Sequence, residues 1–276
     1  MAVDDPASSS VQPAVEFLRS RLPGRPSVGI ILGSGLGGYA DEAQALAAIP
    51  YQEIPGFPRC SVEGHAGRLV LTERGGACVA ILQGRVHRYE GYALDTVIRP
   101  VRVLAALGVQ TLIVTCAAGA LDDAPPGTCM LIEDHLNLMG DNPLMGAAPG
   151  GGGFGGFVEM AGAYDRALLA LGERAALAAG LPVRRGILAA VTGPTYETGA
   201  EAAMLGRLGA QAVSMSTVPE VIIARALGLR VLGLALITNQ AGAPLDCQVG
   251  HRQVVAMATS KAAAIGIWLD GVLDGL

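Results

Sequence analysis

The sequence predicts a single α/β domain, built on a mixed, mostly parallel central sheet that helices flank. Short and uniformly apolar segments alternate with longer segments whose apolar residues recur at helical spacing. This pattern is typical of strands buried beneath helices on both faces of a sheet. Of the 276 residues, 51% are apolar, which is enough for a sizeable core. Because no repeat or linker divides the chain, we predict one domain over residues 14–276.

The chain is expected to begin with a disordered leader over residues 1–13, which contain three consecutive serines and two prolines. A short helix is predicted over 15–21. The compact apolar run 28–32 ends at a glycine and predicts a buried strand that leads into a Gly-rich turn.

The next elements are a hairpin, with strands over 69–72 and 78–82 around Gly75-Gly76, and a helix over 94–107 that stops at Gly108. Further strands are expected over 111–115, 130–132, 185–191 and 231–237, and further helices over 164–179, 200–208, 218–227 and 251–273. Thr217 and Pro219 are expected to open the helix at 218.

One long segment, residues 141–162, is rich in glycine and low in complexity. A stretch of this length without regular structure inside a compact domain is more typical of a functional loop than of a simple connection.

The composition excludes several classes of function. A net charge of −5 and scattered arginines leave no basic stripe for nucleic acid. The five cysteines are odd in number and lack metal-ligand spacing, so we expect reduced thiols and no metal site. No apolar segment reaches the length of a membrane span, and no signal core follows Met1. We therefore expect a soluble cytoplasmic protein with no membrane partner.

The most informative segment is 193–201, GPTYETGAE, which places an aromatic ring beside a carboxylate in a loop between a strand and a helix. Tyr196 can stack on a flat heterocycle, and Glu197 can accept a hydrogen bond from its N–H group. A purine has both features, although ordinary surface loops also contain Tyr-Glu pairs.

Two further motifs can bind an anion, although a tight turn without a ligand and a surface arginine beside a structural histidine are the ordinary alternatives. Gly33-Ser34-Gly35 follows the first predicted strand, where backbone N–H groups and a hydroxyl can converge. Arg85 and His87 follow another strand with one residue between them, so both side chains lie on the same side of an extended backbone. A guanidinium and an imidazole together suit phosphate oxygens. Because ligands gather beyond the carboxyl ends of strands in such sheets, these motifs are expected to share one site.

These motifs, with SMSTVPEV at 214–221 and LITN at 236–239, resemble the trimeric class of purine nucleoside phosphorylases from about residue 28 to residue 272. The resemblance implies the nucleoside phosphorylase fold, reversible phosphorolysis of purine nucleosides, a homotrimer, and orthophosphate as co-substrate without any other cofactor. It also implies a role in purine salvage.

The resemblance assigns roles to individual residues. Phosphate would be held by Ser34, His65, Arg85, His87, Ser216 and the backbone of Ala117. The purine would be held by Tyr196, Glu197, Thr238 and Asn239, and the ribose by Tyr89, Met215, His251 and Phe154. Catalysis would rest on Asn239, Glu197 and His87. Phe154 would reach the neighbouring subunit's site, although four glycines replace a more polar stretch here, so Phe157 is an alternative.

Asn239 bears on the choice of substrate. Its amide N–H can donate to N7 or O6 of a base, whereas members of the family that take 6-aminopurines carry an aspartate there. The sequence therefore favours inosine and guanosine over methylthioadenosine, whose phosphorylase is the rival within the family. A nucleoside hydrolase and a non-catalytic nucleoside-binding protein are the remaining alternatives. His135, beside two acids, is expected to be structural.

Overall fold

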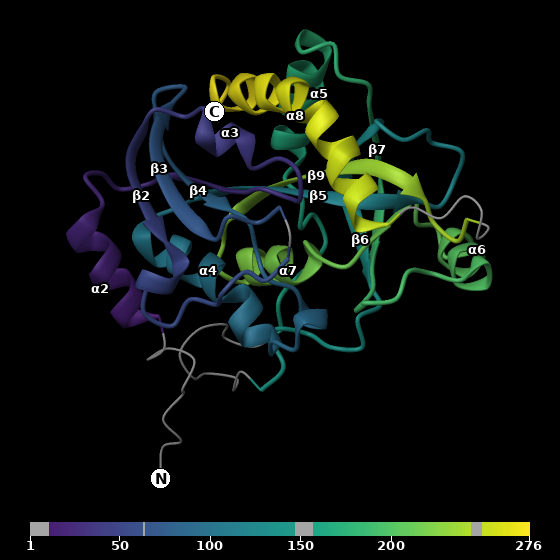
Figure 1. The fold of residues 1–276 in the computed structure, drawn as a ribbon, viewed down its shortest axis with the longest axis horizontal. Coiled ribbons are helices and arrows are strands. Elements are labelled where there is room, and N and C mark those ends of the chain that lie inside the picture. Colours follow the sequence, from purple (N-terminus) through teal and green to yellow (C-terminus); the bar gives the residue numbers. More distant parts are fainter. Residues whose placement is uncertain (1–10, 63, 147–156, 244–249) are drawn as a thin grey trace.

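The computed structural model describes residues 11–62, 64–146, 157–243 and 250–276, which form an α/β domain (Figure 1). The strands are β1 (Val28–Ile31), β2 (Ala45–Pro50), β3 (Arg68–Arg74), β4 (Ala77–Gln83), β5 (Thr111–Ala120), β6 (Cys129–Asn137), β7 (Val183–Ala190), β8 (Ala212–Ser214) and β9 (Arg230–Gln240). The helices are α2 (Gln12–Arg21), α3 (Gly38–Asp41), α4 (Leu94–Leu107), α5 (Arg166–Ala178), α6 (Gly199–Arg207), α7 (Val218–Ala226) and α8 (His251–Leu273), with 3-10 turns η1 (Tyr51–Glu53) and η2 (Arg88–Glu90).

The sheet is mixed and partly closed. Its strand order is β2-β3-β4-β1-β5-β8-β7-β6-β9, and β9 also pairs with β5, so five of the strands form a ring. Pairing is parallel for β1–β4, β1–β5, β5–β9, β6–β7 and β7–β8, and antiparallel for β2–β3, β3–β4, β5–β8 and β6–β9. The predicted mixed, mostly parallel sheet is confirmed, while its closure was not foreseen.

Strand β5 makes the closure possible, because it pairs with β1, β8 and β9. Its last four residues are small, and the ladder to β9 shifts register between Ala118 and Gly119. A Cβ on Gly119 would lie 3.1 Å from the Cβ of Ala241. Small residues therefore let β8 and β9 both pair with the end of β5, which is also where the candidate site begins.

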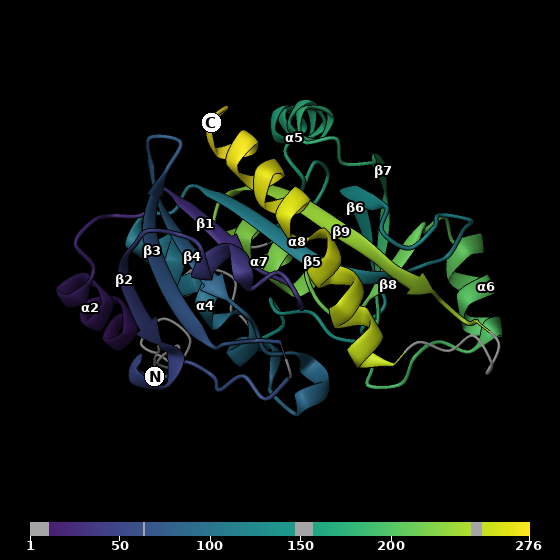
Figure 2. The same ribbon diagram turned by 45° about the horizontal axis from the view of Figure 1, so that its top comes forward.

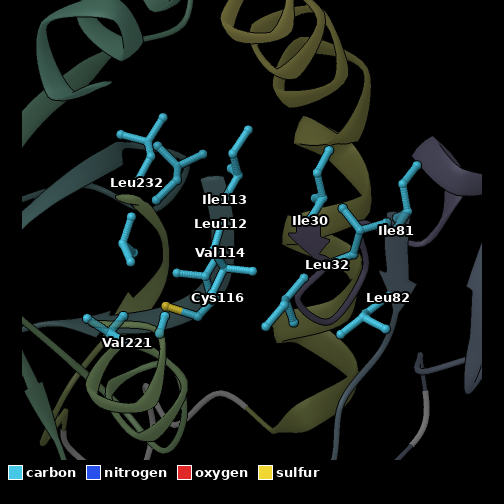
Figure 3. Close-up of a cluster of buried hydrophobic side chains, with 14 of the residues drawn as sticks. Ile30, Leu32, Ile81, Leu82, Leu112, Ile113, Val114, Cys116, Val221 and Leu232 are labelled. Atoms are coloured by element: carbon cyan, nitrogen blue, oxygen red, sulfur yellow. The ribbon is translucent and has the colours of Figure 1, made fainter. Parts of the chain in front are cut away.

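Helices cover both faces of the sheet, as predicted. Helices α5 and α8 pack together on one side, and α4 packs with α7 and α2 on the other (Figures 1 and 2). The core lies between these layers and the strands (Figure 3), where Ile30, Ile113 and Leu232 have no more than a trace of exposed surface. Val221 of α7 reaches the opposite face of the same strands.

Most predicted elements occur within a few residues of their expected bounds, including the hairpin at Gly75-Gly76 and the helix that ends at Gly108 in a left-handed conformation. Helix α2 begins at Gln12, so the last two residues of the predicted leader are helical; residues 1–10 lie outside the described part. Strands β5 and β6 continue well beyond the predicted segments at 111–115 and 130–132.

Among the described residues, the elements that were missed are the strands β2 and β8, the short helix α3 and both 3-10 turns. Strand β2 lies at the edge of the sheet and is Ala-rich with several exposed residues, so its sequence lacks a clear strand pattern. Strand β8 has only three residues and owes its existence to pairing with β5 and β7. The expected cap at Thr217 was wrong: its hydroxyl makes no capping bond, and its φ of 74° is left-handed.

Candidate active site

One pocket lies at the carboxyl ends of β1, β4, β5, β7, β8 and β9. It brings together all the predicted site residues that the structure describes: Ser34, His65, Arg85, His87, Tyr89, Ala117, Tyr196, Glu197, Met215, Ser216, Thr238, Asn239 and His251. Phe154 lies outside the described residues. Residues far apart in the sequence thus share one surface because the strands that precede them are neighbours in the sheet.

The Arg85 side chain is buried, and three elements hold its guanidinium. Nη1 donates to Glu220 Oε1 at 3.1 Å and to Thr217 Oγ1 at 3.3 Å, both at the start of α7. Nη2 donates to the carbonyl of Thr115 in β5. The Thr115 hydroxyl accepts from the Gly33 N–H at 2.9 Å, which ties the Gly-rich turn to the same network. Arg85 is therefore a rigid cation at one end of the pocket.

His87 is oriented by Glu90, three residues later. Glu90 Oε1 accepts from the His87 backbone N–H at 2.7 Å and lies 2.9 Å from His87 Nδ1. Burial acts to raise the pKa of Glu90, but hydrogen bonds from His87 and the Ser61 hydroxyl outweigh it and lower that pKa to about 2. An ionised Glu90 fixes the proton on Nδ1, so Nε2 is the ring atom left to face the pocket. The Tyr89 ring stacks on His87 with centroids 4.8 Å apart.

Ser34 and His65 complete this polar end. Ser34 Oγ lies 3.2 Å from His65 Nε2, and the rings of His65 and His87 are 5.5 Å apart. Burial lowers the pKa of His65 to about 3, with smaller electrostatic contributions from Arg85 and the neighbouring His87 ring. Gly84 must be glycine, because its φ is +108° and a Cβ would lie 2.6 Å from the Cβ of His65. His65 Nδ1 is buried with no hydrogen-bond partner among the described residues.

The segment after β8 forms the next part of the wall. The Ser214 hydroxyl donates to the Ala117 carbonyl at 2.9 Å, which joins β8 to the end of β5. Ser216 follows, with its hydroxyl 3.4 Å from that of Ser214. Met215 packs so closely on Gly193 that a Cβ there would lie 2.3 Å from its sulfur. Gly193 therefore sets the distance between Met215 and the loop that carries Tyr196.

The opposite end of the pocket carries amide and carboxylate groups. The Thr238 hydroxyl has two acceptors within reach, Asn239 Oδ1 at 2.9 Å and the Ala118 carbonyl at 3.3 Å, and the shorter contact is to Asn239. Asn239 Nδ2 donates to the Gln240 carbonyl at 3.3 Å. One N–H of the Asn239 amide is thereby left for a ligand. Burial raises the pKa of the Glu197 carboxyl, with a smaller contribution from the charge of Glu201. The Tyr196 ring is half-exposed beside it.

Sequence reasoning missed the residues that orient the site. Ser214 and Glu220 lie in the quoted segment 214–221, and Thr115 precedes Ala117, but no local pattern indicates that they hold Arg85 and Ala117. Glu90 was detectable, since an acid three residues after a histidine is a common orienting pair. His135 is structural, as expected: its Nδ1 lies 3.1 Å from the buried Tyr164 hydroxyl, outside the pocket.

Within the part of the chain that the structure describes, no three His, Cys, Asp or Glu side chains are grouped as metal ligands. Over the same residues, no helix is long and apolar enough to cross a membrane.

Comparison with known proteins identifies the class of this fold and site. Residues 27–274 match the Phosphorylase superfamily, and the chain belongs to that family. It is 48% identical over 258 residues to purine nucleoside phosphorylase 1 of Geobacillus stearothermophilus, which covers 93% of both chains. The predicted resemblance to purine nucleoside phosphorylases is confirmed.

Solved structures agree with this relationship. The chain superposes on Schistosoma mansoni purine nucleoside phosphorylase in complex with inosine with a TM-score of 0.90, at 36% identity and over 97% of this chain and 96% of that one. A complex of that enzyme with adenosine gives 0.89 at 36% identity, over 100% and 99% of the chains. The protein described here is a pentosyltransferase that catalyses the phosphorolysis of purine nucleosides. The hydrolase and non-catalytic alternatives are therefore wrong.

Proposed function

We propose that the enzyme acts on 6-oxopurine nucleosides, inosine and guanosine with their deoxy forms, and releases the free base and (deoxy)ribose 1-phosphate. The observation that carries this proposal is the hydrogen bond from Thr238 to Asn239 Oδ1. With its oxygen occupied, the amide presents an N–H, which can donate to O6 or N7 but opposes a 6-amino group. Relatives have been crystallised with inosine and with adenosine, so their ligands alone do not decide the preference.

Phosphate would bind at the polar end of the pocket. Arg85 supplies the fixed positive charge and the Ser34 hydroxyl a further donor, while His87, whose Nδ1 proton is held by Glu90, presents Nε2 as an acceptor for the P–OH of monohydrogen phosphate. Ser216, His65 and the backbone of Ala117 surround the same position. The unpartnered Nδ1 of buried His65 supports a polar ligand here, because an unsatisfied buried nitrogen is costly without one.

The ribose would lie between the two ends, against Tyr89, Met215 and His251. Breaking the glycosidic bond places positive charge on the sugar and negative charge on the departing purine. The bound phosphate dianion stabilises the sugar cation and then forms the new C1–O bond. Asn239, supported by Thr238, donates to the charge that develops at N7 and O6, while Glu197 accepts from N1–H. Loss of one such preorganised donor raises the activation free energy by roughly 3 kcal/mol.

We further propose that the active enzyme is a homotrimer in which Phe154 or Phe157 reaches the neighbouring subunit's pocket. The exposed side chains of Met145 and Phe157 support a partner surface on either side of residues 147–156. Sedimentation of the parent, with nucleoside KM values for Phe154→Ala and Phe157→Ala, tests this. A monomer with full activity contradicts it. Location in the cytoplasm and a role in purine salvage stay predictions.

Base release from inosine, guanosine, adenosine and methylthioadenosine, each with and without phosphate, tests the proposed substrate class. We expect rapid, phosphate-dependent release from inosine and guanosine only. Preferential cleavage of methylthioadenosine would instead support the rival activity within the family. Release at the same rate without phosphate would contradict the assigned phosphate site.

A further inference from the structure

A buried carboxylate stands directly behind the cation of the proposed phosphate site. Glu220 lies in the first turn of α7, is only 2% exposed, and does not line the pocket. Its Oε1 accepts from Arg85 Nη1 at 3.1 Å, and the Arg85 side chain is itself 6% exposed. The two side chains thus form an ion pair that is buried from solvent. In such a pair the cost of removing both charges from water offsets much of their attraction, so its main effect is on geometry and not on net stability.

The ion pair and its neighbours occupy some of the N–H donors of Arg85 and leave others for a ligand. A guanidinium has five N–H groups. Glu220 and Thr217 take those of Nη1, and the Thr115 carbonyl takes one of Nη2. Among the described residues, Nε–H and the second Nη2–H have no protein acceptor. These two groups form a fork that matches two oxygens of a phosphate.

Burying the Glu220 carboxylate costs free energy, and packing alone does not explain why a charged group lies at this position. Glu220 Oε2 is buried and has no hydrogen-bond partner among the described residues. A neutral acceptor would hold Nη1 without leaving a charged oxygen unpaired. What a carboxylate adds is a stronger and more directional bond to the guanidinium, because charge-assisted hydrogen bonds are roughly twice as strong as neutral ones.

We propose that Glu220 is a positioning residue for phosphate: it holds Nη1 of Arg85 so that Nε and Nη2 face the pocket. This inference rests on the proposed role of Arg85 in binding phosphate. Thr217 contributes to the same arrangement. Its φ of 74° turns the chain between Ser216, which lines the pocket, and Glu220, which lies behind Arg85.

An opposing effect makes the proposal testable. A negative charge behind Arg85 also repels a phosphate dianion, so a Glu220 that acted only through its charge would weaken phosphate binding. Removing that charge would then raise kcat/KM for phosphate. If the positioning of Arg85 dominates, removing the charge lowers kcat/KM for phosphate.

The experiment compares Glu220→Gln, which keeps the shape and one acceptor, with Glu220→Ala, which removes the contact. Steady-state kinetics give kcat/KM for phosphate at saturating inosine, and calorimetry gives the inosine Kd without phosphate. We expect phosphate kcat/KM to fall at least threefold in Glu220→Gln and at least tenfold in Glu220→Ala. The inosine Kd should stay within twofold.

Two further arms separate positioning from general structural damage. In an Arg85→Ala background, Glu220→Gln should change phosphate kcat/KM by less than twofold, because the group through which it acts is gone. The matched control is Glu173→Gln, which makes the same change in the surface pair of Glu173 with Arg185 at 2.7 and 2.8 Å and should leave all constants unchanged.

Phosphate kcat/KM equal to or above the parent value in Glu220→Gln would overturn the inference, as would a loss that persists at full size in the Arg85→Ala background. A parallel loss of inosine affinity would also overturn it. If Glu220→Ala does not fold, the Gln variant and its double variant decide alone. Unchanged phosphate kinetics in Arg85→Ala itself would instead refute the proposed phosphate site.

Discussion

Replacement of Asn239 by aspartate inverts the hydrogen-bonding pattern at the base end of the pocket with little change in shape. In the parent, Oδ1 of the amide is occupied by the Thr238 hydroxyl at 2.9 Å. A carboxylate keeps that bond through one oxygen and places its second oxygen where Nδ2 stood. The substrate then meets an acceptor in place of a donor, and the Gln240 carbonyl, 3.3 Å from Nδ2, faces an anion.

The expected fall in kcat/KM for inosine follows from the loss of this hydrogen-bond donor. An unpaired or opposed polar group in a buried site costs about 1–3 kcal/mol, and more when a charge is involved. Since about 1.36 kcal/mol corresponds to a factor of ten in rate, kcat/KM for inosine should fall by roughly ten- to a hundredfold. A 6-amino group can donate to the new carboxylate, so adenosine should become a measurable substrate.

The assay is kcat/KM for inosine and for adenosine in both proteins at saturating phosphate. Thermal unfolding serves as the control for folding, and Asn239→Ala separates loss of the donor from gain of the acceptor. We expect the inosine-to-adenosine ratio to fall by at least two orders of magnitude in Asn239→Asp. If the ratio is the same in both proteins, Asn239 does not read the base and the proposed 6-oxopurine preference fails.

Three other predictions concern the phosphate end, acid stability and the base loop. Arg85→Ala should raise the phosphate KM at least tenfold and change the inosine Kd much less; equal losses in both would contradict the assignment. Burial lowers the pKa of His65 from 6.5 to about 3, so below pH 6.5 the unfolded chain binds a proton that the folded chain excludes, and stability falls. Between pH 7 and pH 5, urea titrations should show a loss of stability that is about 2 kcal/mol larger in the parent than in His65→Asn. Thr198 caps α6 directly after Glu197, so Thr198→Ala should cost about 1 kcal/mol in thermal unfolding and raise the nucleoside KM.

The sequence by itself determined the fold class, most of the helices and strands, and the residues that line the pocket. The reason is local. Buried strands such as 28–31 and 231–237 are uniformly apolar, and the helix at 94–107 ends at a glycine that adopts the left-handed conformation. Site residues follow directly after such strands in short motifs, so placing the strands also placed the motifs at one edge of the sheet. His87 could be placed in this way, whereas the role of Asn239 in reading the base followed from the resemblance to purine nucleoside phosphorylases.

Only the tertiary structure decided how those residues are held. The closure of β5 with β8 and β9 depends on pairing between segments about a hundred residues apart, and a strand as short as β8 has no pattern of its own. Glu220 reaches Arg85 across 135 residues, and Thr115 reaches it across 30. Buried polar side chains take the partners that the fold brings to them, because an unsatisfied donor or acceptor is costly wherever it lies in the chain. Such pairings are properties of the packed molecule, and no local segment of sequence contains them.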